Sequence, residues 1–138
     1  MAKRTRQQAP PQRLILDASA VIALSRADVR ARATLAAAVE ARAEISIPAV
    51  VVAETIRGAA TDTPVNRVLK AVGEVDVVDE PIGRTAGRLL GEAGSNATVD
   101  AVVVATAVEA GTAVVLTGDP DDLRALAAGR REVVIEPL

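Results

Sequence analysis

The chain has 138 residues, a length typical of one domain, and half of them are apolar although Phe, Tyr and Trp are absent. His and Cys are absent too, which excludes an imidazole base, a thiol nucleophile and an ordinary zinc site. The net charge of −2 is uneven, because the first 13 residues carry four basic residues and no acid, which leaves −6 on residues 14–138. Carboxylates with a hard cation such as Mg²⁺ are therefore the main chemistry open to an enzyme of this composition.

The first 13 residues are expected to form a basic, disordered tail, since Gln7-Gln8 and Pro10-Pro11 lie among their charges. Such an arm can also bind nucleic acid, but a solvated terminus is the favoured interpretation. Residues 14–138 are expected to fold as one domain. No apolar run approaches the ~20 residues of a membrane span and no signal-peptide core is present, so we expect a soluble cytoplasmic protein without membrane contact.

The segment Leu14-Ile15-Leu16 is typical of a short strand that is buried on both faces, as in a parallel sheet. Asp17 follows it directly, at the edge where open α/β sheets bind ligands. Asp17 is thus either a site residue or the cap of the next helix.

Further along the chain, helical and strand patterns alternate, which predicts an α/β fold: a three-layer sandwich with a central, mostly parallel sheet flanked by helices. Ser25 with Asp28 resembles a capping box that opens a long helix. Helices are expected over 19–24, 25–43, 48–57, 64–72, 80–93, 100–110 and 120–128, and strands over 14–16, 44–47, 75–78, 112–116 and 132–135.

Three more acids stand out by their positions. Glu54 interrupts an apolar helix, where it is equally well explained by a surface pair with Arg57 or by a site facing the sheet edge. Asp100 lies on a helix whose positions i+3, i+4 and i+7 are all apolar, which favours a site residue over a helix-dipole partner. Asp119 follows a strand as a potential helix cap, but capping does not explain Asp121 and Asp122 as well.

Several α/β families carry an Asp after the first strand, and their second features are missing here. A haloacid-dehalogenase-type phosphatase needs a second Asp where Ser19 stands. A response-regulator receiver needs an acidic pair before its phosphoacceptor and a late Lys, neither of which the chain has. No Gly-x-Gly-x-x-Gly or Walker sequence follows a strand, which disfavours dinucleotide or nucleoside-triphosphate binding.

Four segments together resemble the PIN domains, and among these the VapC-type ribonuclease toxins of toxin–antitoxin pairs. They are Leu16-Asp17-Ala18-Ser19-Ala20-Val21-Ile22, Ile47-Pro48 through Glu54-Thr55-Ile56-Arg57-Gly58, Val99-Asp100-Ala101, and Val115-Leu116-Thr117-Gly118-Asp119. The resemblance implies that Asp17, Glu54, Asp100 and Asp119 form an acidic metal pocket, with Ser19 and Thr117 as hydroxyl neighbours. It also implies Mg²⁺- or Mn²⁺-dependent RNA cleavage, a homodimer and a VapB-type antitoxin. Asp122 is an alternative to Asp119 as the fourth acid.

A cluster of carboxylates supports the same chemistry on physical grounds. Two such charges about 4 Å apart repel by roughly 4 kcal/mol at an effective dielectric constant of 20, so a cluster raises pKa values or binds a cation. In this hypothesis Asp17 and Asp100 ligate the metal, Glu54 and Asp119 complete or orient its shell, and a metal-bound hydroxide attacks the phosphodiester. Without aromatic side chains to stack on bases, RNA must be held by phosphate contacts, by the planes of Arg side chains or by a dimer groove. The candidate basic residues near the site are Arg57, Arg84, Arg88 and Arg124.

Two other functions remain open at this stage. The chain could be a catalytically weak module whose acidic pocket receives a basic antitoxin peptide, both acting together as a DNA-bound repressor. It could also be a nuclease that acts on DNA, because only the family resemblance distinguishes RNA from DNA.

Overall fold

The structure is a computed structural model that describes residues 12–138. The elements, in chain order, are β1 (Arg13–Leu16), α1 (Ala18–Ser25), α2 (Val29–Glu40), β2 (Glu44–Pro48), α3 (Ala49–Thr55), the 3-10 helix η1 (Ala60–Asp62), α4 (Thr63–Val72), β3 (Val75–Asp76), α5 (Glu80–Ala93), α6 (Thr98–Ala110), β4 (Ala113–Thr117), α7 (Pro120–Leu126) and β5 (Val133–Pro137).

All five strands are parallel and lie in the order β3-β2-β1-β4-β5. The expected α/β fold is therefore confirmed, with a sheet that is wholly rather than mostly parallel. In the register of the central pair, Leu16 lies opposite Leu116. The residues that follow β1 and β4 consequently emerge side by side at one edge of the sheet.

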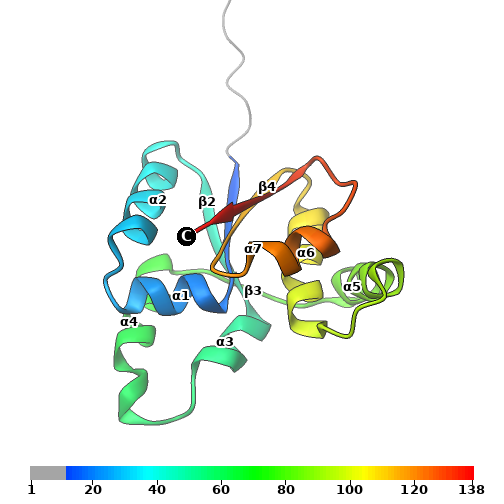
Figure 1. The fold of residues 1–138 in the computed structure, drawn as a ribbon. Coiled ribbons are helices and arrows are strands. Elements are labelled where there is room, and N and C mark those ends of the chain that lie inside the picture. Colours follow the sequence, from blue (N-terminus) through cyan, green and yellow to red (C-terminus); the bar gives the residue numbers. More distant parts are fainter. Residues whose placement is uncertain (1–11) are drawn as a thin grey trace, which may run out of the picture.

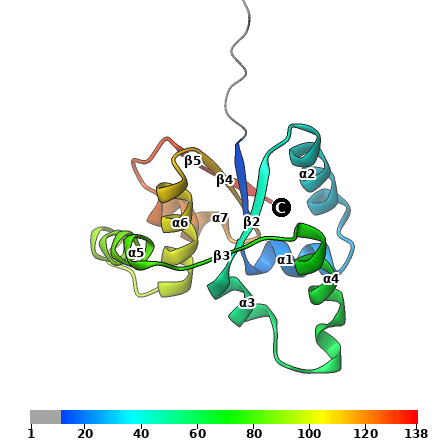
Figure 2. The ribbon, with the colours of Figure 1, turned by 180° about the vertical axis from the view of Figure 1, so that it is seen from behind.

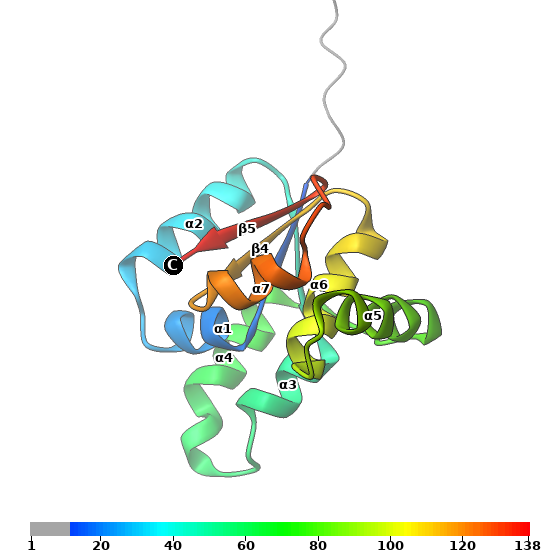
Figure 3. The ribbon, with the colours of Figure 1, turned by 45° about the vertical axis from the view of Figure 1, so that its right-hand side comes forward.

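Helices cover both faces of the sheet (Figure 1). The helices α1, α2 and α4 pack on one face, and α6 packs on the other with α5 and α7 beside it. Figure 2, the view from behind, shows β3 next to β2 at one side of the sheet, and Figure 3 brings α5, α6 and α7 to the front. The helix α3 lies beyond the carboxyl ends of the strands, near the start of α6 (Figure 1).

The core contains only small and branched apolar side chains. Ile15 and Leu16 of β1 are fully buried, as expected for a central strand. Between the sheet and α5, the helix α6 is buried around most of its circumference from Ala101 to Ala107. That burial explains why α6 has apolar residues on nearly every side rather than on one stripe.

Several expected helix boundaries are correct, and one is wrong. Asp79 caps α5 through its bond from the Ile82 N–H at 3.1 Å, as predicted. The helix expected over 25–43, however, begins later, because α2 spans only Val29–Glu40. Ser25 ends α1, where its hydroxyl donates to the Ile22 carbonyl at 2.6 Å, and Asp28 is the N-cap of α2. The capping-box pattern misplaced the start because Asp28 is itself the cap.

Arg13 begins β1, one residue before the domain boundary expected from the sequence. Its guanidinium contacts Glu44 at 2.7 Å and Asp76 at 3.3 Å, so it ties β1 to β2 and to the short strand β3. The rest of the predicted basic tail, apart from Gln12, lies outside the described residues. Within residues 12–138, no helix has the length and apolar character needed to span a membrane.

Candidate active site

Asp17 directly follows β1 and is only 6% exposed. Its side chain caps α1 by accepting a hydrogen bond from the Ala20 N–H at 2.9 Å and another from the Ser19 hydroxyl at 2.6 Å. The capping interpretation of Asp17 is thus correct, and capping uses only one of its two carboxylate oxygens. No hydrogen bond within residues 12–138 involves the second oxygen, which can accept further interactions.

Ser19 links the ends of the two central strands. Its hydroxyl accepts a hydrogen bond from the Gly118 N–H at 2.7 Å while it donates to Asp17. Thr117, the last residue of β4, is fully buried, and its hydroxyl accepts from the Asp119 N–H at 2.9 Å. Both hydroxyls therefore fix the loop that carries Asp119, and they do so through its backbone.

Asp119 occupies the N-cap position of α7, but its side chain makes no capping hydrogen bond. Its carboxylate is exposed, as is that of Asp122 in the first turn of the same helix. Asp121 is paired instead with Arg124 at 3.7 Å. Asp119 and Asp122 are thus both left for another role.

Glu54 lies near the end of α3 and is exposed, not buried as the site interpretation assumed. The alternative pair with Arg57 is not formed either. The Arg57 guanidinium donates instead to the carbonyls of Ala53 and Ile56, each at 3.0 Å. Glu54 therefore has no salt bridge within the described part of the chain.

Asp100, on the first turn of α6, is the point at which the candidate acids meet. Burial raises its pKa, and the negative charges of Asp17, Glu54, Asp122 and Asp119 raise it further. Four carboxylates from three separate parts of the chain therefore lie close enough to repel Asp100 electrostatically. Asp119 and Asp122 both contribute to this effect, so the choice between them as the fourth acid stays open.

The chemistry of this group suits a hard divalent cation, because every side chain offers carboxylate oxygens. No three of the carboxylates in residues 12–138, however, are arranged as ligands of one ion. The exposed side chains of Glu54, Asp119 and Asp122 form no hydrogen bond or salt bridge within that range, so no such contact has to break for them to turn inward. The carboxylate oxygens and their shared negative charge fit a divalent cation, which would draw these side chains together.

Comparisons with known proteins identify the family and the fold. The sequence profile of the PIN domain matches residues 14–129, which is most of the chain. The chain belongs to the PIN-domain family. No curated protein is significantly similar to it in sequence.

Solved structures share the fold of this PIN domain. A toxin–antitoxin complex from Klebsiella pneumoniae is 22% identical, with a TM-score of 0.67 over 88% of this chain and 95% of that chain. VapBC2 from Rickettsia felis, bound to a DNA fragment from its promoter, is 13% identical, with a TM-score of 0.72 over 91% and 98%. PAE2754 from Pyrobaculum aerophilum is 21% identical, with a TM-score of 0.57 over 90% of each chain. At these identities the likeness concerns the fold.

The PIN domain contains another buried acid, Asp62, in the segment Thr61-Asp62-Thr63-Pro64, whose sequence predicts only a turn into the next helix. Asp62 is 6% exposed and accepts hydrogen bonds from the backbone N–H groups of Arg57, Gly58 and Ala59 at 2.7 to 3.1 Å. Burial acts to raise its pKa, but these bonds outweigh burial and lower it, with help from the Arg57 charge. Asp62 thereby holds the segment that follows α3 and its Glu54. A Thr-Asp-Thr-Pro turn gave no sign that the Asp side chain folds back.

Of the four arginines suggested as RNA contacts, three already interact locally. Arg57 donates to backbone carbonyls, Arg84 pairs with Glu80 at 3.2 Å, and Arg124 pairs with Asp121. Arg88 is exposed and forms no such contact within residues 12–138. These exposed pairs are weak, so phosphate could displace the carboxylates.

Proposed function

We propose that this PIN domain is a metal-dependent endoribonuclease and the toxin of a VapBC-type toxin–antitoxin pair. Membership of the PIN family, whose members are typically nucleases, supports this assignment, as do structural neighbours that are toxin–antitoxin complexes. The absence of His and Cys supports it as well, because phosphodiester cleavage by clustered carboxylates and a cation requires neither residue.

The observation that carries the proposal is the convergence of four acids on Asp100. A structural role does not explain it, because like charges destabilise a fold unless a cation or protons neutralise them. Asp17 alone has a structural task, as the cap of α1. Binding of Mg²⁺ or Mn²⁺ at this site would neutralise the repulsion and so account for the unfavourable arrangement.

In this proposal, the role of each acid at the metal follows from how deeply its side chain is buried. Asp17 and Asp100, the less exposed pair, hold the cation directly, and Glu54, Asp119 and Asp122 supply outer or additional oxygens. When bound, the cation neutralises phosphate charge and promotes ionisation of water. Ser19 keeps Asp17 oriented, and Thr117 holds the backbone that carries Asp119.

The test is incubation of the purified protein with labelled RNA in Mg²⁺ and in Mn²⁺, with an EDTA control. Asp17→Asn and Asp100→Asn keep the shape of each side chain but remove its charge, so both should lower cleavage at least 100-fold. Asp121→Asn is the matched control, because Asp121 lies on α7 beside the site but is paired with Arg124. Full activity of Asp17→Asn, or activity in EDTA, contradicts the proposal. Labelled DNA in the same assay separates a ribonuclease from a deoxyribonuclease.

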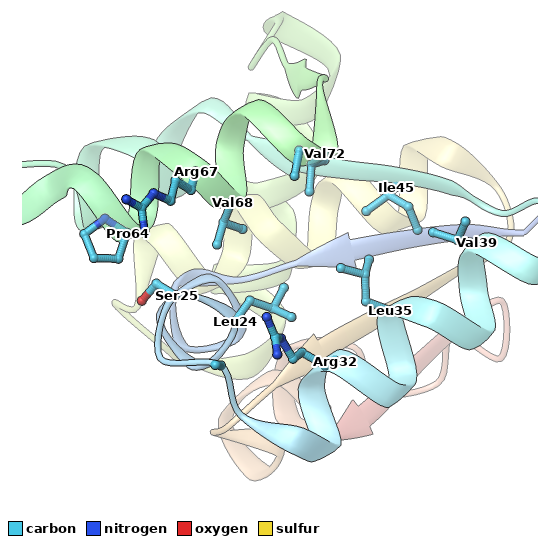
Figure 4. A pocket seen from close by; sticks show the side chains of 12 residues that line it. Leu24, Ser25, Arg32, Leu35, Val39, Ile45, Pro64, Arg67, Val68 and Val72 are labelled. Atoms are coloured by element: carbon cyan, nitrogen blue, oxygen red, sulfur yellow. The ribbon is translucent and has the colours of Figure 1, made fainter.

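A second function, antitoxin binding, is favoured by an apolar groove at the carboxyl end of α1, whose amino end lies at the site. The groove has a volume of about 530 Å³ and lies between α1, α2, β2 and α4. Figure 4 shows Leu35 and Val39 of α2 facing Val68 and Val72 of α4 across it, with Ile45 of β2 at its base. Two arginines also line it, Arg32 and Arg67. We infer that it holds an antitoxin segment with apolar residues and nearby acids, while basic residues of the same antitoxin reach the acidic site.

In the extreme form of this alternative, catalysis is weak and the protein mainly binds a basic antitoxin peptide within a DNA-bound repressor. Coexpression with the product of an adjacent small basic reading frame tests the groove. Val39→Glu should weaken that complex at least tenfold, since it places a carboxylate among apolar groups. Val29→Glu is the control, because Val29 is also an exposed valine of α2 but does not line the groove. Equal binding by both variants contradicts this location. Cleavage measured in parallel shows whether catalysis is present.

The proposal includes a homodimer. Light scattering of the purified protein tests this part, with a mass of 14.1 kDa expected for a monomer and twice that for the dimer.

A further inference from the structure

A second hollow lies along one face of α1 and begins at the candidate active site. It has a volume of about 520 Å³ and is lined by Ser19, Ile22, Ala23, Arg26 and Asp28. The first four of these residues are spaced i, i+3, i+4 and i+7, which places them on a single face of the helix. The floor of the hollow is therefore one straight helical surface that leads away from the acids (Figure 1, where α1 is blue).

One end of this floor is connected to the site by hydrogen bonds. The Ser19 hydroxyl contacts Asp17 at 2.6 Å and the Gly118 N–H at 2.7 Å. Ser19 therefore belongs both to the candidate site and to the lining of the hollow.

The other end carries an arginine on a rigid support. The Arg26 N–H donates to the carbonyls of Ile22 and Ala23, each at 3.1 Å, and the Asp28 N–H donates to Ala23 at 3.0 Å. Between them, Ala27 has a left-handed φ of 59°. The backbone is therefore fixed in a tight turn, while the Arg26 side chain is exposed and forms no salt bridge within residues 12–138.

The charge of Arg26 is favourable for binding because the surroundings are acidic. Residues 14–138 carry a net charge of −6, and a nucleic acid next to the acidic cluster needs positive partners. Asp28 also lines the hollow, but its carboxylate caps the 12-residue helix α2 through the Ala31 N–H at 2.9 Å. The positive end of the α2 dipole offsets part of that negative charge.

We propose that this hollow is the path of the substrate strand beyond the acids, and that Arg26 binds a phosphate of that strand. The inference rests on the proposed nuclease function. Ser19 and Arg26 are separated by about 10 Å along the helix axis, at 1.5 Å per residue. That distance spans roughly three nucleotides of a stacked strand at 3.4 Å each. Arg26 therefore contacts the backbone a few nucleotides from the cleaved bond.

The floor between these ends predicts how the strand is recognised. Ile22 and Ala23 provide an apolar surface for sugars, and no aromatic residue is present to stack on bases. Recognition at this position consequently depends on the phosphate and not on the base, so RNA and DNA of any sequence should share the Arg26 contact.

The test measures binding of a fluorescent single-stranded RNA by anisotropy at increasing KCl, with Ca²⁺ in place of Mg²⁺. Arg26→Gln should weaken binding about three- to tenfold, and the slope of log K against log salt should become shallower by about 0.7, the value for one phosphate contact. Arg26→Lys should retain most of the slope. Arg131→Gln is the control: it removes the same charge from an exposed arginine just before β5, at the opposite edge of the sheet.

The possible outcomes separate this inference from the proposed function. If the wild type cleaves RNA with metal but Arg26→Gln and Arg131→Gln have equal affinities and slopes, the path is wrong and the nuclease remains. If Arg26→Gln weakens antitoxin binding and leaves RNA binding unchanged, the hollow holds protein and the inference is overturned. If the wild type neither binds nor cleaves nucleic acid, both proposals fail.

Discussion

Ser19 and Gly118 are 99 residues apart in the sequence, yet the Gly118 N–H donates to the Ser19 hydroxyl at 2.7 Å. The same hydroxyl donates to Asp17 at 2.6 Å. One side chain therefore connects the acid after β1 to the loop after β4. We infer that Ser19 is a positioning residue, which acts on cleavage through the placement of Asp17 and Asp119.

Replacement of Ser19 by Ala should lower RNA cleavage about tenfold and the free energy of unfolding by about 1 kcal/mol, since two hydrogen bonds are lost, one of them to a charged group. Because the acids remain, metal-dependent cleavage should persist at a reduced kcat, which Ser19→Thr should partly restore. Ser25→Ala is the control on the same helix, since that hydroxyl contacts only the Ile22 carbonyl. Equal kcat for Ser19→Ala and wild type would remove the positioning role.

Gly118 has little room for a side chain. A Cβ atom there would lie 3.3 Å from the Cβ and Oγ of Ser19, closer than most such contacts. Gly118→Ala should therefore shift Ser19 and lower cleavage several-fold. Gly91→Ala is the control, because nothing lies within 4 Å of a Cβ at that position in α5. That change should leave cleavage intact and stabilise the protein by about 0.5 to 1 kcal/mol through helix propensity. RNA cleavage rates and urea unfolding of both variants test the expected difference in activity and in stability.

The raised pKa of Asp100 predicts an unusual response to pH and to metal. Burial and four negative neighbours disfavour its charged form in the folded state. Without metal, its contribution to stability should therefore improve as the pH falls from neutrality through the raised pKa, and level off below the ordinary carboxyl value. At neutral pH, Asp100→Asn should raise the metal-free melting temperature, because it removes this repulsion.

Added metal should reverse this order, so that the wild type melts at a higher temperature than Asp100→Asn. A cation that binds only the folded state at 100 times its Kd stabilises the wild type by about 2.7 kcal/mol, and Asp100→Asn should lose most of that gain. Thermal melts with EDTA and with Mn²⁺ provide the comparison. A wild-type melting temperature that does not respond to Mn²⁺ or Mg²⁺ would count against the cation site.

The sequence was sufficient to predict the strand before Asp17, because that strand depends on a local pattern. Branched apolar runs identify central strands, and an acid directly after such a run is easily found. The orientation of each acid was less predictable. Glu54 is exposed although the residues around it are apolar, because α3 lies beyond the end of the sheet and not on its face.

The hydrogen bonds that shape the site could not be predicted from local pattern. The Ser19–Gly118 bond requires that β1 and β4 be neighbours, and strand order is not encoded in either segment. Asp119 and Asp122 could not be distinguished by local pattern, because both lie at the start of α7, whose position relative to α6 is set by tertiary packing. The position of Arg26 directly after α1 could not be predicted, because the pattern favoured a helix start at Ser25, whereas Ser25 ends α1.

Asp62 should make the protein sensitive to acid. Despite the opposing effect of burial, its backbone hydrogen bonds lower its pKa in the folded state. A lowered carboxyl pKa contributes stability above the ordinary value, and that contribution is lost as the pH falls through the lowered pKa. Asp62→Asn should therefore lower the melting temperature at neutral pH and flatten its decline below about pH 4. Asp28→Asn is the control, because Asn caps a helix about as well as Asp. Identical pH profiles for Asp62→Asn and wild type would show that the three bonds contribute little.

Ser46 in β2 should be a position where removal of a polar group stabilises the fold. Its side chain is 1% exposed, and its hydroxyl has no hydrogen-bond partner among the described residues. A buried hydroxyl without a partner costs about 1 to 3 kcal/mol in lost hydration, whereas Ala at the same site loses only the contacts of one oxygen atom. Ser46→Ala should consequently raise the free energy of unfolding by up to about 1 kcal/mol.

Thr106→Val supplies the matched comparison, since Thr106 is also buried but donates to the Val102 carbonyl at 2.8 Å. That substitution removes a hydroxyl that already has a partner, so it should be neutral or destabilising. Urea denaturation of both variants gives the two changes in the free energy of unfolding under the same conditions. A loss of stability in Ser46→Ala as large as that in Thr106→Val would mean that the Ser46 hydroxyl is satisfied in solution, for instance by a bound water.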